Sequence, residues 1–137
     1  MNSEPTTKSL VLYVDDDKDD IELLRDAFER YPDIELLTFS ESYAFLRYVI
    51  NGKSSTRIPS LILIDINMPV LNGKELLTML RSYPHLRNVM IVMYTTSNFH
   101  GDKDFAKGLN ARFVTKPVER QELNTVINEL LAKCGLF

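Results

Sequence analysis

Five short apolar segments alternate with five amphipathic segments along the chain. The apolar segments lie at residues 9–14, 34–39, 61–67, 89–94 and 111–115. The amphipathic segments repeat apolar residues at helical spacing and lie at residues 19–31, 41–50, 72–80, 102–109 and 123–134. Leu61 to Ile64 form an uninterrupted apolar run, which is typical of a strand buried on both faces of a parallel sheet. The pattern therefore predicts five strands and five helices.

The strict alternation of these segments predicts an α/β fold. Successive right-handed βαβ units give an open, doubly wound parallel sheet with helices on both faces. The second and fifth strands are shorter or more polar than the others, so we expect them at or near the sheet edges. The chain has 137 residues and no linker, repeat or low-complexity tract. We therefore expect a single domain over residues 1–137, with a flexible start at residues 1–8.

Composition and charge argue against several classes of function. The formal net charge is −3 and no run of lysine and arginine forms a basic stripe, so direct binding of nucleic acid is not expected. No apolar run approaches the roughly 18 residues of a membrane span, and the polar start lacks the apolar core of a signal peptide. The single cysteine, Cys134, cannot form an internal disulfide. These features predict a cytoplasmic protein without membrane contact.

Side chains suited to chemistry follow the strands at one end of the predicted sheet. Asp15 and Asp16 follow the first strand, Asp65 the third, Thr95 the fourth and Lys116 the fifth. Open α/β sheets bind ligands outside the carboxyl ends of their strands. Because the carboxyl ends of parallel strands point the same way, we expect these five side chains to converge in one crevice.

Three carboxylates in one place repel one another unless a cation offsets their charge. An all-oxygen set of ligands suits magnesium, which commonly bridges to a phosphate oxygen. Lys116 and Thr95 provide the positive charge and the hydroxyl donor that phosphoryl oxygens require. An aspartate carboxylate can itself act as a nucleophile and form an aspartyl-phosphate. The set of residues therefore predicts a site at which Asp65 is phosphorylated.

Taken singly, most of these residues have simpler roles. An aspartate after a strand often caps a helix, which is the preferred interpretation for Asp17 and an equal alternative for Asp15 and Asp16. Thr95 alone is typical of a turn, and Lys116 before a proline is typical of a solvated side chain. The combination is more specific than its members, because all of the strand ends have to coincide at one edge.

Four motifs stand at the strand ends: Asp15-Asp16, the run from Asp65 to Pro69 followed by Asn72-Gly73, Thr95, and Lys116-Pro117. Together they resemble the receiver domains of response regulators in two-component signalling. The resemblance covers roughly residues 9–133. It implies the flavodoxin-like version of the fold, in which the strand order is 2-1-3-4-5.

The resemblance also implies a role for each site residue. Asp65 would accept the phosphoryl group, Lys116 would pair with the phosphoryl oxygens and Thr95 would hydrogen-bond one of them. The cofactor would be magnesium (Mg2+), held by Asp16, Asp65 and the backbone carbonyl of Asn67, with Asp15 helping through a water molecule.

A conformational switch is part of the same resemblance. Thr95 would shift toward the phosphoryl group, and Phe113, at the family's switch position, would move inward with it. The Lys116–Pro117 peptide bond would be cis. The signal would leave from the face made by the fourth helix, fifth strand and fifth helix. Tyr94, Phe99 and Phe113 either belong to that face or pack in the core, and the sequence leaves both alternatives open.

Partners follow from the resemblance as well. The phosphoryl donor would be a phosphohistidine of a sensor histidine kinase or of a histidine phosphotransfer protein. Single-domain regulators paired with phytochrome-type kinases are a similar subgroup. We expect no output domain after the last helix, so the signal would pass to a downstream protein target, and a phosphorylation-dependent homodimer is one hypothesis for the output. The protein is not expected to be an enzyme beyond catalysing its own phosphorylation and dephosphorylation.

Competing functions lack residues that they require. A phosphatase of the haloacid-dehalogenase type needs a second aspartate two residues after the first, where Asn67 stands. A flavin-binding protein of the same fold needs a hydroxyl- and glycine-rich loop after the first strand, where three aspartates stand. A P-loop nucleotide hydrolase needs a glycine-rich loop ending in Lys and Ser or Thr, which is missing. A scaffolding pseudo-receiver would lack one of the five site residues, and none is lacking.

Overall fold

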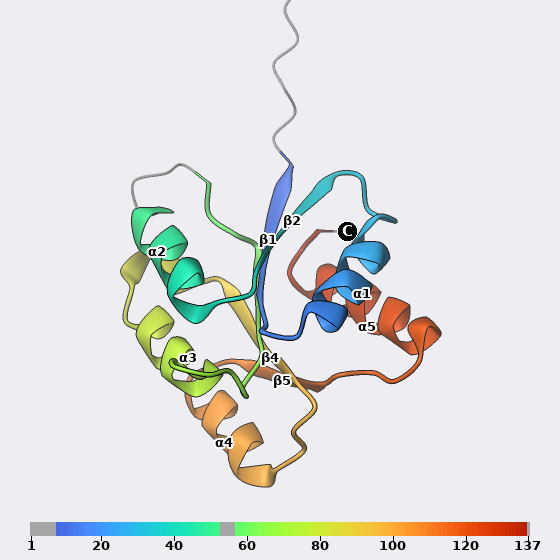
Figure 1. The fold of residues 1–137 in the computed structure, drawn as a ribbon. Coiled ribbons are helices and arrows are strands. Elements are labelled where there is room, and N and C mark those ends of the chain that lie inside the picture. Colours follow the sequence, from blue (N-terminus) through green and yellow to red (C-terminus); the bar gives the residue numbers. More distant parts are fainter. Residues whose placement is uncertain (1–7, 53–56, 137) are drawn as a thin grey trace, which may run out of the picture.

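The computed structural model describes residues 8–52 and 57–136 (Figure 1). Within these residues the expected strands and helices alternate, and one short 3-10 helix, η1, is added before the fourth strand. The elements are β1 (Ser9–Val14), α1 (Lys18–Phe28), β2 (Ile34–Phe39), α2 (Ser42–Gly52), β3 (Leu61–Ile64), α3 (Gly73–Arg81), η1 (Pro84–Leu86), β4 (Met90–Thr95), α4 (His100–Gly108), β5 (Arg112–Thr115) and α5 (Arg120–Lys133).

The sheet has five strands in the order β2-β1-β3-β4-β5, and every neighbouring pair is parallel. Helices α1 and α5 cover one face, while α2, α3 and α4 cover the other (Figure 1). This arrangement confirms the doubly wound, flavodoxin-like fold and the strand order that the resemblance implied. It also confirms that the second and fifth strands form the two edges.

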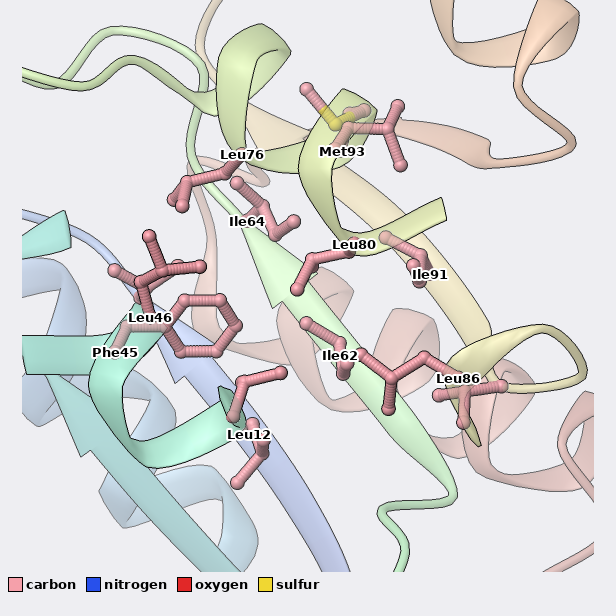
Figure 2. Close-up of a cluster of buried hydrophobic side chains, with 14 of the residues drawn as sticks. Leu12, Phe45, Leu46, Ile62, Ile64, Leu76, Leu80, Leu86, Ile91 and Met93 are labelled. Carbon is pink, nitrogen blue, oxygen red and sulfur yellow. The ribbon is translucent and has the colours of Figure 1, made fainter. Parts of the chain in front are cut away.

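Alternate residues of the central strands enter two separate apolar cores. On β3, Ile62 and Ile64 point into the core beneath α2 and α3, which Figure 2 shows, whereas Leu61 and Leu63 point into the core beneath α1 and α5. All four side chains are at most 1% exposed. Burial on both faces is the physical reason why this strand is apolar at every position rather than at every second one. The flexible start expected at residues 1–8 lies, apart from Lys8, outside the described residues.

Side chains cap the starts of two helices, and the cap of α1 is the one predicted for Asp17. The Asp17 side chain accepts hydrogen bonds from the backbone N–H groups of Asp19 and Asp20 and so caps α1. At α3, Asn72 accepts from the N–H of Glu75, and the Glu75 carboxylate accepts from the N–H of Asn72. Both caps stand directly beside the site, so they fix the path of the chain where the first and third strands end.

The structure corrects one expectation that came from the resemblance. The described residues contain no cis peptide bond, so the Lys116–Pro117 bond is trans. A trans bond before proline is favoured by roughly 0.5–1 kcal/mol unless tertiary contacts oppose it. Here the backbone N–H of Lys116 donates to the carbonyl of Thr95 at 2.7 Å, and its side chain still reaches the site in the trans form.

The described residues contain no helix that is both long enough and apolar enough to cross a membrane.

Candidate functional site

The expected convergence of carboxylates at the sheet edge is confirmed. Asp15 and Asp16 follow β1, Asp65 follows β3, and one carboxylate oxygen from each lies within 4.8 Å of the others. Backbone hydrogen bonds continue past the strand ends, from Asp15 N–H to Phe39 C=O at 3.0 Å and from Asp65 N–H to Val14 C=O at 3.1 Å. The backbone of Asp15 and of Asp65 is therefore fixed by the same hydrogen-bond ladder that holds the sheet together.

Helix α3 approaches the backbone of Asp65 more closely than any side chain would allow. A Cβ atom on Gly73 would lie 2.2 Å from the carbonyl oxygen of Asp65 and 2.8 Å from Cα of Ile66. The N–H of Gly73 donates to the carbonyl of Ile66 at 2.9 Å and holds the helix start in place. In the loop between them, Val70 has φ of 70°, a conformation that costs a β-branched residue about 1–3 kcal/mol.

Asp15 is held from several directions by protein donors. Its Oδ1 accepts from the N–H of Asp17 at 2.9 Å, and its Oδ2 accepts from both the Tyr13 hydroxyl and Lys116 Nζ, the latter at 2.6 Å. The residue is completely buried. Tyr13 is a site residue that the sequence pattern did not predict, although residues 13 and 15 share one face of a strand by their spacing of two. Asp15 is thus orientated by hydrogen bonds on both oxygens.

Lys116 lies between three carboxylates rather than against one. Its Nζ is 2.6 Å from Asp15, 2.7 Å from Asp20 and 3.6 Å from Asp65, and its side chain is 8% exposed. Burial alone would lower the pKa of Lys116, but the hydrogen bonds to Asp15 and Asp20 outweigh it, so the pKa is raised and the side chain stays charged. Sequence reasoning missed Asp20, whose place in the first turn of α1 indicated only a favourable interaction with the helix dipole.

Asp65 lies in an environment that disfavours its charge. Burial raises its pKa and the charge of Asp15 raises it further, whereas the charge of Lys116 and a hydrogen bond from Thr95 act in the opposite direction. The residue is 5% exposed. A cation beside these carboxylates would relieve the remaining repulsion and keep Asp65 ionised. The five residues predicted to converge are thus brought together, with Thr95 buried at the end of β4.

The aromatic residues with two possible roles divide between core and surface. Tyr94 is 5% exposed and packs with Tyr13 at a centroid distance of 5.8 Å, so it belongs to the core. Phe99 is 65% exposed just before α4. Phe113 on β5 is half-buried, and Lys103 Nζ from α4 lies 5.7 Å from its ring centroid. Of the three, Phe99 and Phe113 are therefore the ones that reach the surface beside α4.

An ion pair joins helix α3 to the first turn of helix α4, and the loop after β4 is hydrogen-bonded to the same carboxylate. Lys74 Nζ contacts Asp102 Oδ1 at 2.5 Å, and the Ser97 hydroxyl donates to Asp102 Oδ2 at 2.6 Å. These hydrogen bonds to Lys74 and Ser97 lower the pKa of Asp102. The same residues Lys74 and Asp102 line a shallow hollow of about 540 Å³ together with the exposed Asn67.

We expect Asp102→Asn to lower the free energy of unfolding by about 2 kcal/mol at neutral pH, because it removes a carboxylate that holds two charge-assisted hydrogen bonds. The folded-state pKa is depressed, so this stabilisation is present above the unfolded value near 3.8 and is lost as the pH falls through the folded value. Urea unfolding at several pH values would measure it. Asp104→Asn, an exposed control on the same helix, should change little. A wild-type advantage that stayed constant below pH 4 would contradict the assignment.

The donor set fits a hard divalent cation. Asp15, Asp16 and Asp65 offer oxygen ligands only, which is the preference of magnesium and manganese rather than of softer metals. Asp16 is exposed and lines a hollow of about 160 Å³ that also contains Tyr43 and Met68. Of the three, Asp16 therefore has open space beside it, whereas both oxygens of Asp15 already accept hydrogen bonds.

Fold and site together define a parallel α/β protein with a carboxylate cluster suited to a divalent cation, and a lysine beside it, at the carboxyl edge of its sheet. The chain belongs to the family of response regulator receiver domains, whose model matches residues 11–128.

Two response regulators illustrate the similarity. The chain is 31% identical to response regulator Rcp1 of Synechocystis sp. over 106 residues, which cover 74% of this chain and 71% of Rcp1. The crystal structure of the phosphorylated cyanobacterial phytochrome response regulator RcpA has a TM-score of 0.81 at 25% identity, covering 90% of this chain and 91% of RcpA. The Mn(2+)-bound form of Rcp1 has a TM-score of 0.78 at 26% identity, covering 90% of this chain and 92% of that one.

Proposed function

We propose that the protein is a phosphorylation-activated signalling switch whose phosphoacceptor is Asp65. A carboxylate oxygen of Asp65 would attack the phosphorus of a phosphohistidine, the P–N bond would break, and the imidazole nitrogen would leave with its electron pair and take up a proton. One observation carries this proposal. Asp65 is nearly buried, yet it lies within 4.8 Å of two further carboxylates and 3.6 Å from Lys116.

The same proposal assigns a magnesium site to this chain. Asp16, Asp65 and the backbone carbonyl of Asn67 would hold Mg2+, and Asp15 would support it through a water molecule. When bound, the ion would neutralise charge on the transferred phosphoryl oxygens. Two observations support this assignment: the purely oxygen-based donor set of this chain, and the Mn(2+)-bound form of the related Rcp1.

Lys116 and Thr95 would hold the phosphorylated state. Lys116 Nζ would pair with phosphoryl oxygens, and the Thr95 hydroxyl would donate to one of them. Movement of Thr95 would favour the inward position of Phe113 and alter the surface of α4, β5 and α5, which is a shift between two populated states. The half-buried position of Phe113 beside α4 supports this route, because its ring lies at the boundary between core and surface and can occupy an inward or an outward position.

The donor would be a phosphohistidine of a sensor histidine kinase or of a histidine phosphotransfer protein, and the receiver of the signal would be a protein partner. A homodimer formed on phosphorylation through α4, β5 and α5 is one form that this output could take. The structural relative RcpA, whose structure is that of the phosphorylated protein, supports phosphorylation as the signal that this chain receives. The chain's catalysis would be limited to adding and removing its own phosphoryl group.

The decisive experiment is intact-mass measurement after incubation with phosphoramidate and Mg2+. The wild type should gain one phosphoryl group, and Asp65→Asn should gain none. Asp33→Asn, which removes an exposed aspartate before β2, should behave as the wild type. Omitting Mg2+ or introducing Asp16→Asn should reduce the yield strongly. An adduct of equal yield on Asp65→Asn would refute the assignment of the phosphoacceptor.

A further inference from the structure

The lysine of the site lies closer to two other carboxylates than to the proposed phosphoacceptor. Lys116 Nζ is 2.6 Å from Asp15 Oδ2 and 2.7 Å from Asp20 Oδ2, but 3.6 Å from Asp65 Oδ1. The first two distances are those of charge-assisted hydrogen bonds, and the third is too long for one. Pairing with a phosphoryl group on Asp65 therefore requires Lys116 to weaken contacts that it already makes.

Of the two competing carboxylates, Asp15 is the immobile one. It is completely buried, and the Tyr13 hydroxyl and the N–H of Asp17 hold its two oxygens. Asp20 lies instead on the first turn of α1, where its side chain is 26% exposed. Its carboxylate is favoured there by the helix dipole and can be solvated when the lysine leaves. Lys116 can therefore give up its contact with Asp20 in exchange for a phosphoryl group on Asp65.

We propose that Asp20 is a positioning residue that holds Lys116 away from Asp65 and so lowers the affinity of the site for a phosphoryl group. The inference rests on the proposed function, since it concerns the same acceptor. Asp20 does not touch the phosphoryl group. It acts by competing for Lys116, the cation that is placed to pair with that group, so the free energy gained by the pairing depends on the strength of the Asp20–Lys116 contact.

The test uses beryllofluoride, an anion that stands in for the phosphoryl group, titrated at saturating Mg2+ and followed by NMR. Asp20→Asn keeps the shape of the side chain and removes its charge, so Lys116 is freed. We expect about tenfold tighter binding, corresponding to the loss of one competing charge-assisted hydrogen bond. Asp19→Asn is the matched control, because it removes an equal charge from the neighbouring exposed residue in the same turn. It should change the affinity less than twofold.

The same substitution in a Lys116→Met protein separates competition for the lysine from a direct electrostatic effect of the Asp20 charge on the bound anion. In Lys116→Met, the additional change Asp20→Asn should leave the affinity unaltered, because the side chain through which Asp20 acts is gone. Asp20→Glu keeps the carboxylate and should restore the wild-type affinity. These two results would not follow from a purely structural role of Asp20 in α1.

The outcomes distinguish this inference from the proposed function. If the wild type fails to bind beryllofluoride, or Asp65→Asn binds it equally well, the proposed function falls and this inference falls with it. If the wild type binds and Asp20→Asn matches either the wild type or Asp19→Asn, only the role of Asp20 is overturned. An Asp20→Asn effect that persists in Lys116→Met overturns it as well, because the charge would then act without the lysine.

Discussion

Gly73→Ala is expected to lower the free energy of unfolding by about 3 kcal/mol, the upper part of the range for forcing a methyl group into packed structure. The added Cβ would lie 2.2 Å from the carbonyl oxygen of Asp65 and 2.9 Å from its carbonyl carbon. Both neighbours are backbone atoms, so no flexible side chain can give way. Either the start of α3 or the chain after β3 has to move, and the second movement displaces the proposed phosphoacceptor.

Urea unfolding and phosphorylation by phosphoramidate would measure the two consequences of Gly73→Ala separately. Gly108→Ala is the matched control, because a Cβ on Gly108 at the end of α4 would meet no described atom within 4 Å. That substitution should be neutral or stabilise the protein by up to about 1 kcal/mol, since alanine favours the helix. A Gly73→Ala protein as stable and as readily phosphorylated as Gly108→Ala would show that the close approach has no functional importance.

Lys116→Met is expected to cost about 3–5 kcal/mol of stability in metal-free buffer, the range observed when one partner of a buried ion pair is removed. Asp15 is completely buried and would lose its cationic partner. Asp20 and Asp65 would lose the same neutralising charge. Lys18→Met, at the exposed start of α1, removes an equal charge and should change the stability by less than about 0.5 kcal/mol.

Magnesium should rescue the Lys116→Met protein more than it stabilises the wild type. A ligand that binds only the folded state stabilises it in proportion to its affinity, and a cation bound among carboxylates replaces part of the missing positive charge. Thermal unfolding with increasing Mg2+ would reveal this as a larger rise in melting temperature for the variant. An equal rise in both proteins would indicate that the lysine and the cation do not share the same carboxylates.

Much of the fold follows from short-range patterns in the sequence. The apolar run Leu61–Ile64 is possible only where both faces of a strand are covered, and it is one of the central strands. The capping pair Asn72 and Glu75 act across three residues, so their interaction needs no knowledge of the remainder of the chain. The strand ends that carry Asp15, Asp65, Thr95 and Lys116 could be located for the same reason.

The partners of Lys116 could not be predicted in this way. Asp20 is 96 residues from Lys116 along the chain, and its side chain resembled that of any acidic residue in a first helical turn. The rotamer of the long Lys116 side chain and the exact placement of α1 decide which carboxylate the lysine reaches. The peptide bond before Pro117 is a similar case, because its isomer depends on the tertiary contacts around it.

The sequence by itself determined the alternation of strands and helices, the edge at which charged residues collect and the chemical types present there. These properties depend on the periodicity of apolar residues and on hydrogen bonds between near neighbours. Only the tertiary structure decided that Tyr13 and Lys116 both bind Asp15, that Asp20 shares the lysine, and that α3 can approach Asp65 at Gly73. The reason is physical: such contacts depend on distances of a few ångströms between separate elements, and those distances exist only after the two cores have packed.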